Sequence, residues 1–350
     1  MKIWVVLLIM FKMTTKNSNS VLSRGTDPSA SLLTPSEIRQ IAAALGVTPT
    51  KKLGQNFVHD ASSVRKIVIE SGVAPDTRVL EVGPGLGSLT LALLEAGAYV
   101  SAIEIDSVLA QALPATIRAH NPQAAERCAV LNADALSVTS AQQLAIPQAY
   151  ALSEECAAEK TSLKDVSALG ADIYEPTHLV ANLPYNVAVP VLLTLLEALP
   201  SLKSVTVMVQ AEVADRLAAQ PGSRTYGVPS VKLAWYGEAK RGSAISRNVF
   251  WPVPNVDSAL VHVDLYPREN DLFVNRKRGT KAERTQVFAV IDAAFSQRRK
   301  TLRSALAAWA GSTQRAEEIL KAAQIDPQLR GEKLKLEEFE RIAAAAVEAT

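Results

Sequence analysis

Residues that build disulfide frameworks and metal sites are scarce in this sequence. Its 350 residues include only two cysteines, Cys128 and Cys156, and four histidines. The cysteines lack the spacing of a metal knuckle and the histidines form no cluster, so we expect no metal cofactor. So few cysteines also indicate a reducing compartment, and we expect a cytoplasmic protein.

Long apolar runs are scarce too. The run near the start, Ile3 to Phe11, is too short to span a bilayer. It resembles the apolar part of a secretory signal, but the polar stretch that follows, Lys12 to Asn19, lacks an Ala-x-Ala cleavage pattern. We therefore expect no membrane partner, and we prefer the interpretation that translation starts at Met10 or Met13.

An excess of charge of either sign is also missing. Lys and Arg together number 37 and Asp and Glu 35, which gives a formal net charge of +2. A nucleic-acid enzyme needs a basic surface rather than a basic total, so this value excludes little. With 48% hydrophobic and 21% charged residues, the composition is that of a soluble globular protein.

The order of apolar and polar segments predicts an α/β fold. A helix should begin at Thr34, where Thr-Pro-Ser-Glu supplies an N-cap, a first-turn proline and a capping glutamate, and it should end near Gly46. Apolar strands then alternate with helical segments, and the predicted strands are 78–82, 99–105, 129–131, 178–181 and 205–209. This alternation predicts an open, mostly parallel, doubly wound sheet that binds ligands at the carboxyl ends of its strands.

The same pattern divides the chain into three parts. Residues 1–33 are rich in Ser, Thr, Asn and Gly and should form a disordered leader. Residues 34–267 should form a Rossmann-like domain, in which 135–177 make a long, partly helical connection. Residues 268–350 should form a small all-helical domain, with helices at 283–308 and 314–323.

A glycine-rich turn joins the first of these strands to the next helix. In Glu81-Val-Gly-Pro-Gly-Leu-Gly87 the backbone at Gly83 and Gly85 could approach a ligand that faces the helix N-terminus. Glu104 ends the next strand at about the 20-residue separation expected of a ribose-binding acid. The pattern is Gly-x-Gly-x-Gly rather than the Gly-x-Gly-x-x-Gly of dinucleotide sites, which favours a small adenosyl cofactor. Asp134, after the third strand, would accept a hydrogen bond from the exocyclic amine of that cofactor, although alone it could be a helix cap.

The tetrapeptide Asn182-Leu-Pro-Tyr185 indicates the chemistry. An adenine N6 amine is a poor nucleophile because its lone pair is delocalised into the ring. If the side-chain oxygen of Asn182 and the carbonyl of Leu183 accept the two amine hydrogens, the nitrogen becomes more tetrahedral and its lone pair can attack a methyl sulfonium. Pro184 would hold that carbonyl in place, and Tyr185 would stack on a base turned out of its own stack. In isolation the tetrapeptide could instead be an Asx-type turn that closes a strand.

Taken in order, several motifs resemble those of the ribosomal RNA adenine dimethylases of the KsgA type. They are Lys52-Leu-Gly-Gln-Asn-Phe-Val58, Glu81-Val-Gly-Pro-Gly85, Asn182-Leu-Pro-Tyr185, Phe250-Trp-Pro-Val-Pro-Asn-Val-Asp-Ser258 and Phe295-Ser-Gln-Arg-Arg-Lys-Thr-Leu302. The resemblance covers about residues 34–345. It implies a Rossmann-like class I methyltransferase domain with a small C-terminal all-helical domain, and S-adenosyl-L-methionine as the cofactor.

Further site residues follow from this resemblance. The cofactor contacts that it implies are Asn56, Val58, Gly83, Glu104, Asp134 and Asn182. Position 58 is usually Leu in the family, but a backbone contact survives the change to Val. Phe250 would form the second aromatic face against the adenine, opposite Tyr185. Without its flanking prolines, Phe250 would be taken for a core aromatic.

Basic residues cluster toward the C-terminus. They are Arg276, Lys277, Arg278, Lys281, Arg284, Arg298, Arg299, Lys300 and Arg303. Such a cluster gives salt-sensitive affinity for an RNA backbone without reading sequence. We take Arg298, Arg299, Lys300 and Arg303 as candidate RNA-binding residues, and the alternative is a solvated helix face. The shape of the RNA and its splayed loop bases would then provide selectivity.

The resemblance implies a specific reaction. It is the dimethylation of N6 of two adjacent adenines in the 3′-terminal hairpin loop of small-subunit (16S) ribosomal RNA, late in ribosome biogenesis. The partner would be the pre-30S subunit, and we expect a monomer.

Three alternatives stay open. The first is a large-subunit ribosomal RNA adenine dimethylase of the macrolide-resistance type, against which the motifs at 54–57 and 250–258 argue. The second is a non-catalytic RNA-binding assembly factor, which would not need a competent cofactor site. The third is a DNA adenine methyltransferase, which would need a sequence-reading module that is not evident here.

Overall fold

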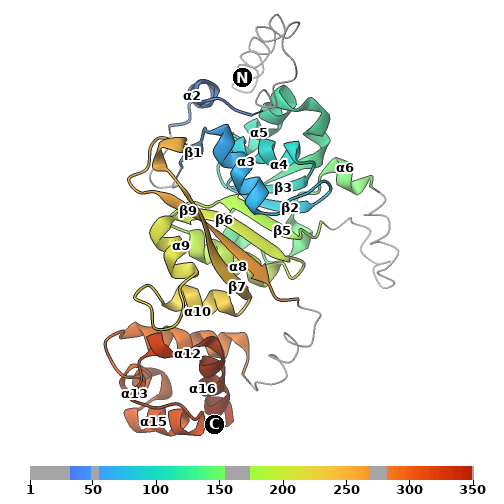
Figure 1. The fold of residues 1–350 in the computed structure, drawn as a ribbon. Coiled ribbons are helices and arrows are strands. Elements are labelled where there is room, and N and C mark those ends of the chain that lie inside the picture. The colour runs from blue at the N-terminus through green and yellow to red at the C-terminus, as the bar shows by residue number, and fades with distance from the viewer. Residues whose placement is uncertain (1–31, 49–54, 154–173, 268–281, 349–350) are drawn as a thin grey trace, which may run out of the picture. The chain divides into compact units, whose positions relative to one another are not determined.

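The computed structural model describes residues 32–48, 55–153, 174–267 and 282–348 (Figure 1). Within these residues a central sheet has seven strands in the order β4-β3-β2-β5-β6-β9-β7. The strands are β2 Arg78–Val82, β3 Tyr99–Glu104, β4 Cys128–Asn132, β5 His178–Asn182, β6 Ser204–Gln210, β7 Gly237–Ile245 and β9 Ser258–Leu265. Strand β2 pairs in parallel with β3 and with β5, β3 with β4, and β5 with β6. These parallel strands match those predicted from the sequence.

Helices alternate with these strands and then follow them. The α-helices are α2 Pro35–Leu45, α3 Ala61–Glu70, α4 Ser88–Glu95, α5 Ser107–His120, α6 Gln148–Ala151, α8 Ala188–Ala198, α9 Ala211–Leu217, α10 Val228–Ala234, α12 Arg284–Ser296, α13 Leu302–Ala305, α14 Ala307–Ala310, α15 Thr313–Ala322 and α16 Leu336–Glu348. Short 3₁₀ turns are η4 Pro122–Arg127, η5 Ala135–Ser137, η6 Ala141–Gln143, η7 Arg247–Val249 and η8 Gly331–Lys333. In the predicted connection 135–177, residues 154–173 lie outside the described residues, and the rest is partly helical.

Local sequence sets the bounds of helix α2. The Thr34 hydroxyl accepts a hydrogen bond from the Glu37 amide at 3.3 Å, and the Glu37 carboxylate accepts one from the Thr34 amide at 2.8 Å. Gly46 ends the helix with a left-handed φ of 67°. These caps confirm the predicted helix. Leu32 and Leu33, which we had placed in the disordered leader, are each only 3% exposed and belong to the core.

Two further strands bring distant motifs together. Strand β1, Phe57–Val58, pairs antiparallel with β8, Phe250–Trp251, so that Phe57 lies opposite Trp251. The rings of these two residues stack at 6.3 Å between centroids. The motif that contains Asn56 and the motif that begins at Phe250 are therefore parts of one local structure.

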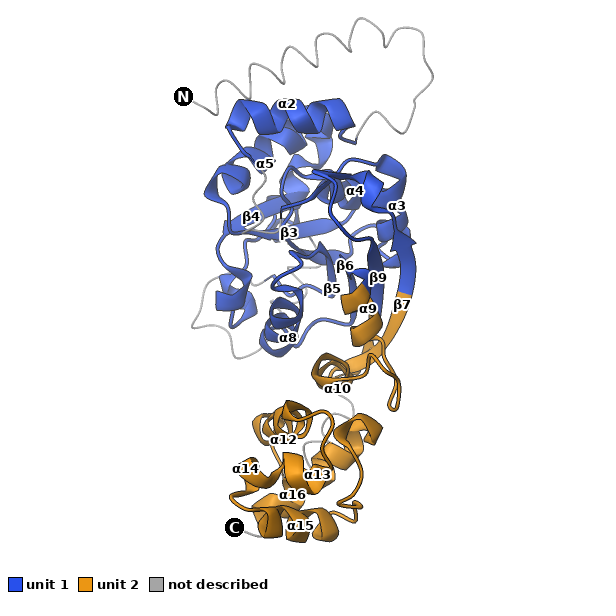
Figure 2. Ribbon diagram, turned by 90° about the vertical axis from the view of Figure 1, so that its left-hand side faces the viewer, with its two compact units in different colours: residues 1–211, 242–262 blue, residues 212–241, 263–350 orange. Residues whose placement is uncertain are grey.

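The chain divides into two compact units (Figure 2). Unit 1 comprises residues 1–211 and 242–262, and unit 2 comprises 212–241 and 263–350. Our predicted domain boundary at residue 267 stays a prediction. In the described ranges no helix is long and apolar enough to cross a membrane, and no group of three or more His, Cys, Asp or Glu could hold a metal ion.

The predicted single helix at 283–308 is wrong. Helix α12 ends at Ser296, and the chain turns before α13 and α14 begin. Arg298 stabilises this turn. Its guanidinium donates hydrogen bonds to the Glu332 carboxylate at 3.3 Å and to the Tyr226 carbonyl at 3.4 Å. The spacing of apolar residues along a helix does not predict contacts between residues so far apart in the chain, and so it did not predict this turn. The other predicted helix, 314–323, is confirmed as α15.

Candidate active site

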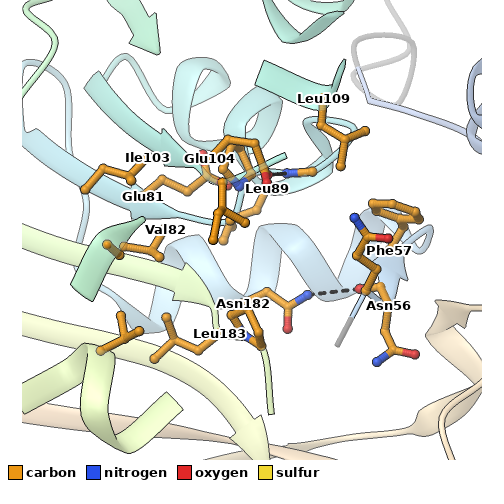
Figure 3. A pocket seen from close by; sticks show the side chains of 18 of the residues that line it. Asn56, Phe57, Glu81, Val82, Leu89, Ile103, Glu104, Leu109, Asn182 and Leu183 are labelled. Carbon is orange, nitrogen blue, oxygen red and sulfur yellow. Dashed lines mark hydrogen bonds between the residues drawn. The ribbon is translucent and has the colours of Figure 1, made fainter. Parts of the chain in front are cut away.

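A pocket in unit 1 lies at the carboxyl ends of β2, β3 and β5 (Figure 3). Strand β2 stands between the other two, so the winding direction of the sheet reverses here, where such sheets bind ligands. The pocket is lined by all but one of the site residues that we predicted in this unit. They are Asn56, Val58, Gly83, Gly85, Glu104, Asp134, Asn182, Leu183, Pro184 and Tyr185.

The turn after β2 has a backbone that only glycine adopts without strain. Gly83 and Gly85 have φ values of 68° and 57°. A Cβ added at Gly85 would lie 2.9 Å from Cε1 of Phe57, whereas one added at Gly83 would meet nothing closer than 3.9 Å. The turn thus forms a glycine cradle, in which the backbone just before helix α4 carries no side chain and can be approached by a ligand.

Glu104 ties this cradle to the end of β3. Its side chain is buried, and Oε2 accepts a hydrogen bond from the Gly85 amide at 3.0 Å. Oε1 accepts one from the Asp106 amide at 2.9 Å. Burial raises the pKa of the Glu104 carboxyl, and these hydrogen bonds oppose the rise. Each oxygen has a second lone pair, so Glu104 can also accept hydrogen bonds from ligand hydroxyls.

Asp134 caps a turn and also lines the pocket, so the two roles that we had treated as alternatives are compatible. Its Oδ1 accepts a hydrogen bond from the Leu136 amide at 2.9 Å and caps the short turn η5. The same residue lines the pocket and is exposed. A carboxylate has acceptor capacity beyond one hydrogen bond, so the cap leaves Asp134 able to accept a ligand amine.

Asn182, the last residue of β5, is held from across the pocket. Its Nδ2 donates a hydrogen bond to the Asn56 carbonyl at 3.2 Å (Figure 3). With the amide nitrogen engaged there, Oδ1 is the acceptor that the side chain offers to a ligand. The next residue, Leu183, is anchored by its own amide, which donates to the Met208 carbonyl at 3.1 Å. The side-chain acceptor of Asn182 and the backbone acceptor of Leu183 are therefore both held in position.

Tyr185 is positioned by a residue that the sequence analysis did not single out. Its hydroxyl forms a 2.7 Å hydrogen bond with Oγ of Ser258, a fully buried residue at the start of β9. The only signal in the sequence was that Ser258 ends the motif beginning at Phe250. Ser258 lies 73 positions from Tyr185 along the chain, so no local pattern gives a separate hint of this role.

Phe250 is the predicted site residue that the structure does not bring to the pocket. Its side chain is fully buried in the core of unit 1, and it is absent from the residues that line the pocket. This placement agrees with the core-aromatic alternative. A role for Phe250 as an aromatic face against the adenine stays a prediction.

The four candidate RNA-binding residues of unit 2 fall into two groups. Arg298 binds Glu332 and backbone carbonyls, and Arg303 forms an ion pair with Glu317 at 3.1 Å. Arg299 and Lys300 are exposed and form no ion pair with the described residues. Arg276, Lys277, Arg278 and Lys281 lie outside the described residues.

Comparison with known families identifies close relatives of the chain. The model of the family "Ribosomal RNA adenine dimethylase" matches residues 47–347. A protein named ribosomal RNA small subunit methyltransferase A from Streptomyces avermitilis is 57% identical over 312 residues, which are 89% of this chain and 93% of that protein. A protein of the same name from Thermobifida fusca is 53% identical over 314 residues, 90% of this chain and 96% of that protein.

Solved structures share the fold at low identity. A dimethyladenosine transferase from Plasmodium falciparum matches 82% of this chain and 95% of its own, with a TM-score of 0.58 and 18% identity. The 23S rRNA methyltransferase ErmE matches 83% of this chain and 100% of its own, with a TM-score of 0.53 and 22% identity. The predicted Rossmann-like class I methyltransferase fold is confirmed.

Proposed function

The chain belongs to the ribosomal RNA adenine dimethylase family, and on this premise we propose that it dimethylates N6 of two adjacent adenines in the 3′-terminal hairpin loop of small-subunit ribosomal RNA. It is an S-adenosylmethionine-dependent methyltransferase. The observation that carries the proposal is the Asn182 amide, fixed by the Asn56 carbonyl beside a glycine cradle. We further propose that it acts on the pre-30S subunit, in the cytoplasm and as a monomer.

The pocket fits the cofactor by its donor and acceptor set. S-adenosylmethionine supplies a methyl group on a positively charged sulfur. Glu104 would accept hydrogen bonds from its ribose hydroxyls and Asp134 from its adenine amine. Gly83 and Gly85 keep the backbone free of side chains where the ligand approaches. Asn56 and Val58 also line the pocket.

Asn182 at the end of β5 and Leu183 after it would prepare the target amine. Oδ1 of Asn182 and the carbonyl of Leu183 would each accept one N6 hydrogen, which localises the nitrogen lone pair and orients it. These fixed acceptors need no reorganisation when charge develops on the nitrogen. The displaced amine proton passes to water, so no side chain is required as a strong base. Repetition on the same nitrogen gives the dimethylated product.

The ring of Tyr185, rather than its hydroxyl, should matter most for catalysis. Tyr185→Ala removes the surface on which the turned-out base would stack, and kcat/KM should fall by about 10–100-fold. Tyr185→Phe keeps the ring and loses only the hydrogen bond to Ser258, so the loss should stay below about tenfold. Steady-state kinetics of both variants on unmodified small subunits measure the difference. Equal losses in the two variants would mean that the hydroxyl is essential and the ring is not.

Arg299 and Lys300 should contribute to RNA affinity without contributing to the fold. Replacing either with alanine should weaken subunit binding. A plot of log affinity against log salt concentration falls with salt, and the replacement should make its slope less steep by about 1. Arg298→Ala is the contrasting variant, because it removes the contacts to Glu332 and Tyr226. It should lower the free energy of unfolding by about 1 kcal/mol. Binding titrations at several salt concentrations, together with thermal melts, separate these roles. A lower melting temperature for Arg299→Ala would argue that this residue is structural.

The substrate class can be tested by comparing methyl transfer to three acceptors. Methyl transfer from labelled S-adenosylmethionine is measured on unmodified small subunits, on large subunits and on duplex DNA. We expect labelling of the small subunit alone. Labelling of large subunits would favour the macrolide-resistance class of dimethylase, and binding to small subunits without any transfer would favour an assembly factor.

A further inference from the structure

Glu81 is a third carboxyl group in the lining of the pocket, beside Glu104 and Asp134. Glu81, on β2, is 1% exposed, and its Oε2 has no hydrogen-bond partner among the described residues. It lines the same pocket as Glu104 (Figure 3). A buried carboxyl oxygen without a partner is costly, so a ligand that satisfies it is the natural explanation.

The pocket surrounding Glu81 is acidic and lacks positive charge. Its lining residues include three carboxyls, those of Glu81, Glu104 and Asp134, and no described Lys, Arg or His. The groups that face Glu81 are the Thr90 hydroxyl on α4, Glu104 on β3 and the Cys128 thiol on β4. Burial raises the pKa of the Glu81 carboxyl to about 8, and the charge of Glu104 adds to the rise. The Thr90 hydroxyl opposes it. Burial also keeps the Cys128 thiol neutral by raising its pKa.

The cofactor and its product differ in charge at one atom. The sulfur of S-adenosylmethionine is a cationic sulfonium, whereas that of S-adenosylhomocysteine is a neutral thioether. The ammonium and carboxylate of the amino acid part are common to both ligands. A group that titrates in response to the sulfur can therefore distinguish them.

We propose that Glu81 makes the pocket select the charged cofactor over the neutral product, by losing its proton when the sulfonium ligand binds and regaining one when the product forms. This inference rests on the proposed function. In the reaction the bond from sulfur to methyl breaks, the bond from N6 to methyl forms, and the amine proton leaves to water. A separate proton from water returns to Glu81, so below a pH of about 8 its carboxyl is mostly neutral when the sulfur is neutral.

The sign of the pH dependence follows from this exchange. A positive charge in the pocket favours the ionised carboxyl, so the pKa of Glu81 is lower in the S-adenosylmethionine complex than in the free protein. The affinity for S-adenosylmethionine should then rise with pH up to about 8 and level off above it. Each unit by which the pKa falls corresponds to about a tenfold gain in affinity. The affinity for S-adenosylhomocysteine should show no such rise.

Titration calorimetry tests the inference without any turnover. At pH 7.5, binding enthalpies are measured in two buffers of different ionisation enthalpy, which gives the number of protons released per ligand bound. We expect the wild-type protein to release protons with S-adenosylmethionine and none with S-adenosylhomocysteine. Glu81→Gln should bind the product unchanged, bind the cofactor about tenfold more weakly, and release no protons with either. Glu95→Gln, outside the pocket and paired with Arg65, is the matched control and should behave as the wild type.

Two results would overturn the inference. One is equal proton release with the two ligands in the wild-type protein, a comparison that needs no variant to fold. The other is proton release with S-adenosylmethionine that persists in Glu81→Gln. If neither ligand binds the wild-type protein, the proposed function itself fails along with this inference.

Discussion

Replacing Asn182 with alanine lowers kcat for methyl transfer by about 10²–10³-fold, the loss expected when one fixed group that acts on the transition state is removed. The structure gives the reason, because the Asn56 carbonyl holds the Asn182 amide nitrogen at 3.2 Å and leaves the oxygen as acceptor. Binding of S-adenosylmethionine should weaken by no more than about tenfold, the contribution of a single hydrogen bond. Single-turnover kinetics and cofactor titration measure the two effects separately.

Asn186→Ala is the matched control for this variant. It removes the same side-chain amide four positions along the chain, at an exposed residue that does not line the pocket. Its kcat should stay within about twofold of the wild type, because the residue is exposed and lies outside the lining of the pocket. An Asn182→Ala enzyme that keeps normal kcat would refute the assignment of Asn182 as the acceptor for the amine.

Replacing Gly85 with alanine should damage the cofactor site and the fold together. The new Cβ would lie 2.9 Å from the ring of Phe57, at a φ of 57° that disfavours any side chain. The left-handed backbone costs about 1–2 kcal/mol, and displacement of Phe57 adds to it. We expect the free energy of unfolding to fall by about 2–3 kcal/mol and the affinity for S-adenosylmethionine to fall by at least about tenfold.

Gly83→Ala isolates the contribution of the clash. Its φ of 68° imposes a similar strain, but the added Cβ would meet nothing closer than 3.9 Å. The loss of unfolding free energy should therefore be about 1–2 kcal/mol, smaller than at Gly85. Denaturant unfolding of the two variants measures the difference. If Gly83→Ala were the more destabilised, contact with Phe57 would not be what requires glycine at position 85.

The sequence predicted those parts of the molecule that depend on local pattern. The capping box at Thr34 predicted helix α2, and apolar runs predicted the parallel strands that carry Glu104 and Asn182. Because such strands end at one edge of a sheet, their terminal residues could be expected in one pocket. Strands β7 and β9 were missed. β7 is rich in polar residues such as Lys240 and Arg241, so its sequence lacks the apolar run by which the other strands were predicted.

Long-range contacts set the limits of that prediction. The hydrogen bond between Tyr185 and Ser258 joins residues 73 positions apart, and no pattern in the chain indicates it. The turn after α12 depends on Arg298 contacting residues near 226 and 332, so an uninterrupted helix was the natural expectation from sequence. Phe250 was chosen for its motif, whereas its burial comes from the pairing of β8 with β1. A residue's place in a motif predicts that it lies near the site, but it does not predict whether its side chain faces the ligand.

The central claim is that this chain dimethylates two adjacent adenines of the small-subunit RNA. Its most direct test is mass spectrometry of RNA fragments from unmodified small subunits incubated with the purified protein and S-adenosylmethionine. We expect N6,N6-dimethyladenosine at two neighbouring positions of the 3′-terminal hairpin loop, and we expect it to be absent when Asn182→Ala replaces the wild type. Methyl groups on a different nucleotide, or none on subunits that the protein binds, would contradict it.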